Sequence, residues 1–152
     1  MVRAMTVLAA LAALLLAGCG GSSDKDAYVK EFNGVSVTLE KTLDSIGADI
    51  TTGTKGPQIA AKLDQGARAL DNAATDFSTI KTPSDVKSAH AHVVAGLKQL
   101  AGVFREGATA ARNDDVAKLV DTLRNLNNSP GAKQIQQAQQ ELKDKGYKVR
   151  GT

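Results

Sequence analysis

The sequence predicts an all-α protein, an antiparallel up-down-up-down four-helix bundle with an interrupted fourth helix, preceded by a cleaved signal peptide. Apolar residues recur every three or four positions along most of the chain, which is the period of an amphipathic helix. The periodic segments have similar lengths and are joined by short stretches rich in Gly, Pro, Asn and Asp, as in a bundle of neighbouring antiparallel helices. Aromatic residues make up only 3% of the 152 residues, which disfavours a β-sandwich or barrel.

The first eighteen residues have the features of an export signal. Arg3 supplies a positive charge near the N-terminus, and Ala4 to Leu16 is an uncharged apolar run. This run is shorter than the ~20 residues of a membrane-spanning helix but suits the core of a signal peptide. We therefore expect residues 1–18 to be a signal peptide and residues 26–152 to form one helical domain.

The signal ends in Leu16-Ala17-Gly18-Cys19, which resembles the lipobox of bacterial lipoproteins. The resemblance implies that Leu16, Ala17 and Gly18 are recognised by the lipoprotein signal peptidase. It also implies that Cys19 carries diacylglyceryl and N-acyl chains such as palmitate. Two acyl chains anchor a protein durably. The alternative is an ordinary signal followed by a coincidental cysteine.

This anchor predicts a place in the cell. The mature protein is expected on the outer face of the cytoplasmic membrane, or at the outer membrane of a diderm source. Residues 19–25 are expected to be the lipidated cysteine and a short tether, so that the domain lies close to the lipid headgroups. Cys19 is the only cysteine, which excludes an internal disulfide.

Two helices are predicted in the first half of the domain. The first spans Asp24 to Thr51 with Ser23 as its N-cap, and the second runs from Pro57, a favourable first-turn residue, to about Lys81. The apolar stripe of the first is Tyr28, Phe32, Val35, Leu39, Leu43, Ile46 and Ile50. The stripe of the second is Ile59, Leu63, Ala67, Leu70, Ala74, Phe77 and Ile80.

The third helix is predicted to begin with Thr82 as N-cap and to continue to Arg112. Its stripe is Val86, Ala89, Val93, Leu97, Leu100, Phe104, Ala108 and Ala111. A turn at Asn113-Asp114-Asp115 then opens the fourth helix, which is interrupted at residues 127–131. The stripe of the fourth is Val116, Leu119, Leu123, Leu126, Ile135, Ala138 and Leu142. Gly146 is expected to end it in a Schellman cap that brings Leu142 and Tyr147 together.

The predicted topology places both ends of the domain near the membrane. Tyr28, Phe32, Phe77 and Tyr147 are therefore expected to gather at that end, with Phe104 at the far end. Glycine is frequent inside the helices, at Gly34, Gly47, Gly66, Gly96, Gly102 and Gly107. These glycines indicate close helix approach, low stability, or a wall that opens for an apolar guest.

No catalytic, nucleotide or metal motif occurs, so we expect no enzyme activity and no cofactor beyond the lipid on Cys19. His90 and His92 lie two residues apart on a helix and point in different directions, so they do not share a metal. His90 borders the apolar stripe and is expected to be a partnered boundary histidine. The net charge of +3 is scattered along the chain, which argues against nucleic acid as a partner. The basic C-terminus is either a solvated helix end or a surface for anionic lipid or wall polymer.

The break at Asn127, Asn128, Ser129 and Pro130 is a candidate site for a partner or ligand, because a broken helix frees backbone polar groups. The alternative is an ordinary kink. The Thr-Pro-Ser-Asp-Val segment at residues 82–86 and the Gly-Tyr-Lys-Val-Arg-Gly ending resemble small uncharacterised helical-bundle lipoproteins of actinobacteria. This resemblance implies a location in the cell envelope and no particular activity.

Two functions follow from these expectations. The first is a non-enzymatic, membrane-anchored bundle that binds an envelope protein or supports the envelope. The alternative is a carrier or sensor for a small apolar or lipid-like ligand. A cavity lined by Leu and Ala would favour the carrier, whereas an exposed apolar stripe would favour a protein partner, and a tightly filled core would exclude the carrier.

Overall fold

The computed structural model describes residues 20–50 and 53–150. The predicted signal peptide, its recognition residues and Cys19 lie outside the described residues. In the described part, regular structure is entirely helical, as predicted. The elements are α1 (Gly20–Ala48), α2 (Gly56–Thr79), η1 (Ser84–Val86), α3 (Lys87–Arg112), α4 (Val116–Arg124), η2 (Leu126–Asn128) and α5 (Pro130–Asp144), of which η1 and η2 are 3₁₀ turns.

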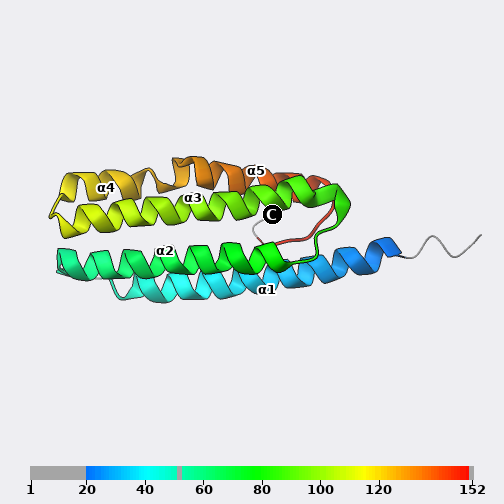
Figure 1. Cartoon of the computed structure of the whole chain (residues 1–152), viewed down its shortest axis with the longest axis horizontal. Coiled ribbons are helices and arrows are strands. Elements are labelled where there is room, and N and C mark those ends of the chain that lie inside the picture. The colour runs from blue at the N-terminus through cyan, green and yellow to red at the C-terminus, as the bar shows by residue number, and fades with distance from the viewer. Residues whose placement is uncertain (1–19, 51–52, 151–152) are drawn as a thin grey trace, which may run out of the picture.

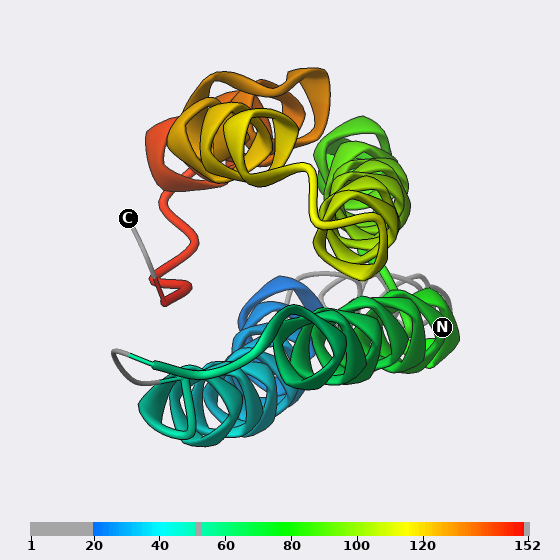
Figure 2. The same cartoon turned by 90° about the vertical axis from the view of Figure 1, so that its left-hand side faces the viewer.

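The helices lie along the long axis of an elongated molecule (Figure 1). α1 packs on α2, α2 packs extensively on α3, and α4 and α5 follow one another along α3. Among the described helices, α1 makes its close backbone contacts with α2. Seen from one end, the C-terminal segment descends from α5 toward α1 (Figure 2). The side of the molecule between α1 and the α4–α5 pair is therefore the least closely packed.

The core is built on α2 and α3, as their apolar stripes predict. Most residues of these two stripes are buried, and exposed ion pairs join the helices at Asp71–Arg105 and Asp64–Arg112. A second, smaller cluster surrounds Leu63 toward the other end. Phe104 packs against both clusters, and its ring lies so near Gly66 that a Cβ there would be 2.6 Å away.

The four aromatic residues expected at one end do gather there. Ring centroids are 5.8 Å apart for Tyr28 and Phe32, 4.8 Å for Phe32 and Phe77, and 5.5 Å for Tyr28 and Tyr147. All four side chains are buried. This end joins the start of α1, the end of α2, the start of α3 and the segment after α5.

The bounds of α1 and α2 differ from the prediction. α1 begins at Gly20, so Ser23 lies within the helix, and the expected N-cap is wrong. Most of the expected tether is therefore helical, because extending an existing helix adds a hydrogen bond for each residue fixed. α1 ends at Ala48, and α2 ends at Thr79, two residues before Lys81.

The start of α3 also differs. Thr82 was expected to cap the helix, but its hydroxyl donates to the carbonyl of Ile80 at 3.1 Å. A 3₁₀ turn at Ser84–Val86 follows, and α3 begins at Lys87. The carboxylate of Asp85 accepts a hydrogen bond from the Tyr147 hydroxyl at 2.9 Å. Asp85 thus bonds to a residue far away in sequence, in the segment after α5.

The start of α4 and the end of α5 agree with the sequence, whereas the cap at Ser129 was not predicted. Asp115 accepts from the Lys118 amide at 3.0 Å and begins α4, while Ser129 accepts from the Ala132 amide at 3.3 Å and begins α5. Gly146 has φ +73°, and the amide of Tyr147 donates to the carbonyl of Leu142 at 2.8 Å. This is the predicted Schellman cap.

The apolar stripe of α4 is a correction. It was expected in the core, but only Leu119 is buried, while Val116 is 66% and Leu123 43% exposed. Thr122 lies beside Gly107 of α3, and Leu119 packs in the cluster of Leu63. Since residues turn by about 100° each, Leu123 and Val116 follow on the side of α4 that faces away from Thr122. No described helix packs closely there, so the stripe stays exposed.

Candidate functional site, an apolar groove beside α1

An open groove of about 610 Å³ is lined by α1, α3, α5, Phe77 of α2 and Arg150 of the C-terminal segment. Its floor is apolar and consists of Phe32, Leu39, Leu43, Phe77, Val93, Leu97 and Ile135. Its rim is polar and consists of Ser36, Glu40, Asp44, Gln139 and Arg150. The volume lies within the range of small-molecule sites, and an apolar lining with a few polar groups is typical of them.

Helical spacing accounts for this division into floor and rim. Leu39 and Leu43 are four residues apart, so they lie on one face of α1. Ser36, Glu40 and Asp44 are also four residues apart, and Glu40 and Asp44 directly follow Leu39 and Leu43. These three polar residues therefore form the neighbouring row on α1. Leu39 and Leu43 are only half buried, so part of the apolar face of α1 remains available to a ligand.

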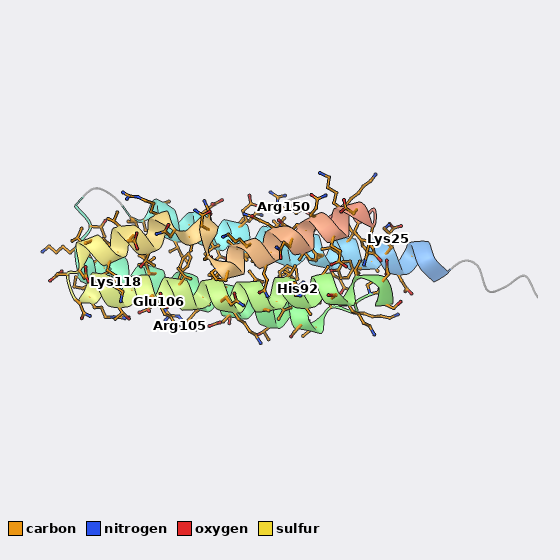
Figure 3. The ribbon with its side chains drawn as sticks, turned by 90° about the horizontal axis from the view of Figure 1, so that it is seen from above. Lys25, His92, Arg105, Glu106, Lys118 and Arg150 are labelled. Carbon is orange, nitrogen blue, oxygen red and sulfur yellow. The ribbon has the colours of Figure 1, made fainter. Side chains whose placement is uncertain are left out.

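The C-terminal segment borders the groove through Arg150. The side-chain amide of Asn33 donates to the carbonyl of Lys148 at 3.3 Å and accepts from the amide of Arg150 at 2.6 Å. Nε of Arg150 donates to Oε2 of Glu40 at 2.7 Å. Along the molecule, Arg150 lies between the levels of Lys25 and Lys118 (Figure 3). The segment thus joins α5 to α1 and ends at the groove mouth.

A buried hydrogen-bond chain joins α1, α2 and α3 in the aromatic cluster. Nε2 of His90 is 2.9 Å from the carbonyl oxygen of Phe77, and Nδ1 is 3.0 Å from the hydroxyl of Tyr28. Because a carbonyl only accepts, Nε2 carries the hydrogen and neutral Nδ1 accepts from Tyr28. His90 is 8% exposed, so it has partners as expected but lies in the core rather than at its boundary.

Burial is the largest cause of the pKa shifts of His90, Tyr28 and Tyr147. It lowers the pKa of His90, although the hydrogen bond to Phe77 opposes the shift. Burial, with a contribution from Tyr147, raises the pKa of Tyr28. Burial, the hydrogen bond from its hydroxyl to Asp85 and the charge of Asp85 raise the pKa of Tyr147 to about 12. His90 and both tyrosines are therefore neutral at pH 7 and act as packing and hydrogen-bonding groups.

A second groove flanks α1 on the side of α2. It has a volume of about 690 Å³ and is lined mainly by polar residues together with Val35, Leu39, Ile46, Ala69 and Ala73. Leu39 lines both grooves. The middle of α1 is therefore incompletely packed on two sides.

The glycines separate into two groups. A Cβ at Gly96 would lie 2.6 Å from Ile135 and 2.7 Å from the carbonyl oxygen of Gly131, so α3 and α5 touch there. No neighbouring atom lies within 4 Å of a Cβ at Gly34 or Gly47, both in α1. Close approach thus explains Gly96 but not the glycines of α1.

The predicted site at the helix break lies elsewhere. Asn127 and Asn128 are exposed, Ser129 is buried as the N-cap of α5, and Pro130 occupies its first turn. The amide of Asn128 donates to Asn125 and that of Ser129 to Leu126, so these backbone groups are already bonded within the turn. None of these four residues lines either groove. The break permits the close contact of α5 with α3.

Sequence reasoning missed the groove and its rim. Its floor residues were predicted as core, but their incomplete cover depends on contacts between segments far apart in sequence. Glu40 and Arg150, for example, are 110 residues apart. A signal did exist in the residues that follow Gly146, because Tyr147 and Val149 are apolar at alternate positions, as in an extended segment with one buried side.

Neither a metal cluster nor a membrane-spanning helix was found within the described ranges. In residues 20–50 and 53–150, no three His, Cys, Asp or Glu side chains are grouped so that they could hold a metal ion. His92 is exposed on α3 (Figure 3). No helix of this part combines the length and hydropathy needed to cross a bilayer. Comparison with known proteins gave no matching family model, no matching curated protein and no matching solved structure.

Proposed function

We propose that the chain is an extracytoplasmic lipoprotein, anchored through Cys19, whose helical domain carries or senses a small apolar or lipid-like ligand. The domain is non-enzymatic in this proposal. Its architecture is an antiparallel four-helix bundle in which α4, η2 and α5 together form the interrupted fourth member. The ligand lies in the groove beside α1.

The incompletely covered apolar floor of the groove is the observation that carries this proposal. A filled core would leave no room for a guest, whereas here the half-buried Leu39 and Leu43 face a space of about 610 Å³. Covering apolar surface gains about 25 cal/mol per Å². A ligand that covers this floor therefore gains binding energy without having to displace a packed side chain.

The position of the groove relative to the anchor supports a carrier or sensor. α1 starts at Gly20, directly after Cys19. At 1.5 Å per residue, Phe32 lies about 18 Å and Leu43 about 35 Å along α1 from its first residue. A ligand in the groove is thus held beyond the headgroups of the anchoring leaflet when α1 stands away from the membrane.

Ligands that copurify with the protein test the proposal. The full chain, processed in its native membrane, is isolated gently and examined by native mass spectrometry. We expect an apolar molecule to be retained by the wild-type protein and lost when Leu39 and Leu43 are both changed to Gln. Changing Val116 and Val120, which are exposed on α4, to Gln is the matched control and should preserve binding. Equal retention by both double variants would reject the groove as the site.

A protein partner is the second candidate, and the exposed stripe of α4 favours it. Val116, Val120 and Leu123 are spaced as one helical face and are 66%, 44% and 43% exposed. Such a stripe can pack against an apolar helix of another envelope protein. Crosslinking in intact cells, compared between the wild-type chain and a variant with Val116 and Val120 changed to Gln, tests this. Loss of one defined crosslinked protein in the variant would support the partner function, and an identical crosslinking pattern would oppose it.

A further inference from the structure

We propose that acid releases the apolar ligand of the groove, because a proton on His90 detaches the start of α1 from α3. This inference rests on the proposed function and adds a regulation of the same groove. Three features carry it: the bonds of both ring nitrogens of His90, the pairing of the charged groups around the ring, and the side chains that the aromatic cluster shares with the groove.

Both ring nitrogens of His90 have partners that require a neutral ring. Nε2 donates to the carbonyl oxygen of Phe77 at 2.9 Å, and Nδ1 accepts from the hydroxyl of Tyr28 at 3.0 Å. Both side chains are shielded from water, since His90 is 8% and Tyr28 1% exposed. A proton that enters at Nδ1 turns this acceptor into a donor. The hydroxyl hydrogen of Tyr28 then loses its acceptor inside the core, which is unfavourable for a buried polar group.

The charged groups on the C-terminal side of the aromatic cluster already have partners. Both carboxylate oxygens of Asp85 lie within hydrogen-bond distance of the Tyr147 hydroxyl, at 2.9 and 3.2 Å. Nζ of Lys145 donates to the main-chain carbonyl of Asp85 and to the carboxylate of Glu141. The carboxylate of Asp85 therefore bonds to Tyr147 rather than to the His90 ring.

The charged groups of α1 and α2 beside the cluster do not neutralise the proton either. The ammonium group of Lys25 lies 4.5 Å from the centre of the Tyr147 ring and adds a positive charge at this end. Asp24 pairs with Lys81, which follows α2, at 3.6 Å. A charged His90 would thus lie in the core without a counter-charge, which is costly. The remaining charged side chains close in sequence to the cluster are exposed: Asp26, Lys30, Glu31, Asp76, Lys87, Lys143, Asp144, Lys148 and Arg150.

α1 is the helix that moves when His90 is charged. His90 and Phe77 belong to α3 and α2, which pack extensively on each other. The start of α1 is held to the rest of the bundle partly by hydrogen bonds of exposed groups, from Lys25 to the main chain after α5 and from Asn33 to the C-terminal segment. Moving Tyr28 away from His90 therefore disrupts less packing than separating α2 from α3, and it lets water solvate the charged ring.

The aromatic cluster and the groove share two side chains. Phe32 and Phe77 lie on the groove floor, with ring centroids 4.8 Å apart. Phe32 also packs on Tyr28 at 5.8 Å, and Phe77 packs on His90 at 6.2 Å. When the start of α1 moves with Tyr28, Phe32 leaves Phe77 and the floor loses part of its apolar surface. Acid thus weakens ligand binding, and by thermodynamic reciprocity a bound ligand holds His90 neutral.

Photolabelling of the full, processed chain in phosphatidylcholine vesicles measures the release. The probe is trifluoromethylphenyl diazirine, a small apolar molecule that stays uncharged at the pH values used. At pH 7 we expect it to label peptides of α1 and α3 at the groove floor. Half-maximal labelling of these peptides should need about tenfold more probe at pH 5 than at pH 7, because one coupled proton changes an affinity by at most about tenfold per pH unit.

Two histidine variants assign the proton to its site. His90→Gln has no titrating ring, while its side-chain amide can still donate to Phe77 and accept from Tyr28. Half-maximal labelling of this variant should need the same probe concentration at pH 5 as at pH 7. His92→Gln is the matched control, since His92 is exposed on the same helix, and it should retain the tenfold change. Circular dichroism of each variant verifies that the helices are intact.

Hydrogen exchange of the wild-type chain locates the motion without any substitution. After correction for the intrinsic effect of pH on exchange, the peptide that contains Tyr28 and Phe32 should exchange about tenfold faster at pH 5 than at pH 7. At pH 5 this exchange should depend little on added urea, as for a local opening that exposes little surface. Exchange in α2 and α3 should be slower and should rise steeply with urea.

The outcomes distinguish this inference from the proposed function. Equal labelling of the groove at pH 5 and pH 7 would overturn acid release and leave the carrier in place. Acid release that persists in His90→Gln would overturn the role of His90. Equal exchange rates and urea dependence in all helices at pH 5 would indicate global unfolding and overturn the local detachment of α1. A groove floor that the probe does not label at pH 7 would reject the proposed function, and acid release with it.

Discussion

Gly96→Ala tests the close contact between α3 and α5. Alanine would gain about 1 kcal/mol in helix propensity over glycine. Its Cβ, however, would lie 2.6 Å from Ile135 and 2.7 Å from the carbonyl oxygen of Gly131. The backbone of α5 must move to relieve the second contact, so we take about 3 kcal/mol, the upper end of the cost of overpacking. The net expectation is a loss of about 2 kcal/mol, or about 8 °C in Tm at roughly 4 °C per kcal/mol.

The assay is heat and urea unfolding, followed by circular dichroism, of a chain that begins at Gly20. Gly34→Ala is the matched control, because no neighbour lies within 4 Å of its Cβ. It should raise stability by up to about 1 kcal/mol through helix propensity alone. The two variants should thus differ by about 3 kcal/mol. Equal stabilisation by both would refute the close packing of α3 on α5 and the interpretation of the helix break that depends on it.

Three further predictions concern the aromatic end and the anchor. Burial lowers the pKa of His90 in the folded chain, so as the pH falls His90 is protonated in the unfolded chain before it is protonated in the folded one. The free energy of unfolding should therefore decrease below about pH 6.5. Urea unfolding at several pH values should show this decrease in the wild type and in His92→Gln but not in His90→Gln. Tyr147→Phe removes the hydrogen bond to Asp85 and should cost about 1 kcal/mol in the same assay; no loss would mean that the bond contributes nothing to stability. Cys19→Ser should leave an unprocessed precursor or release the protein from membranes, measured by fractionation and mass spectrometry, and a processed variant that stays in the detergent phase would contradict the anchor.

Local signals predicted the parts of the fold that depend on neighbours in sequence. The cap at Asp115 bonds to the amide three residues later, and the Schellman cap at Gly146 joins Leu142 and Tyr147, which are five residues apart. Each of these interactions is complete within about one turn of chain. The stripes of α2 and α3 succeeded for a related reason, since a helix between two neighbours buries its whole apolar face.

Two predictions, the burial of the α4 stripe and the cap at Thr82, were wrong. The stripe of α4 was correctly identified as apolar, but periodicity cannot show whether another helix covers that face. Val116 and Leu123 remain exposed because α1 does not pack closely on α4. Thr82 does not cap α3: its hydroxyl donates to the carbonyl of Ile80, and a 3₁₀ turn precedes the helix. The cover of α4 and the groove both depend on contacts between segments far apart in sequence.

The two halves of α1 differ in their contacts with the rest of the protein, and this difference supports the proposed function. Near its start, α1 contributes Tyr28 and Phe32 to the core and bonds to α3 and the C-terminal segment. Beyond Glu40, α1 contributes only half-buried residues to the core. Asp49, just after the end of α1, forms an exposed ion pair with Lys62, which adds at most about 1 kcal/mol. Segments with few buried contacts open at lower free energy than the rest of a protein. The distal half of α1 can therefore move to admit a ligand while the aromatic end preserves the bundle.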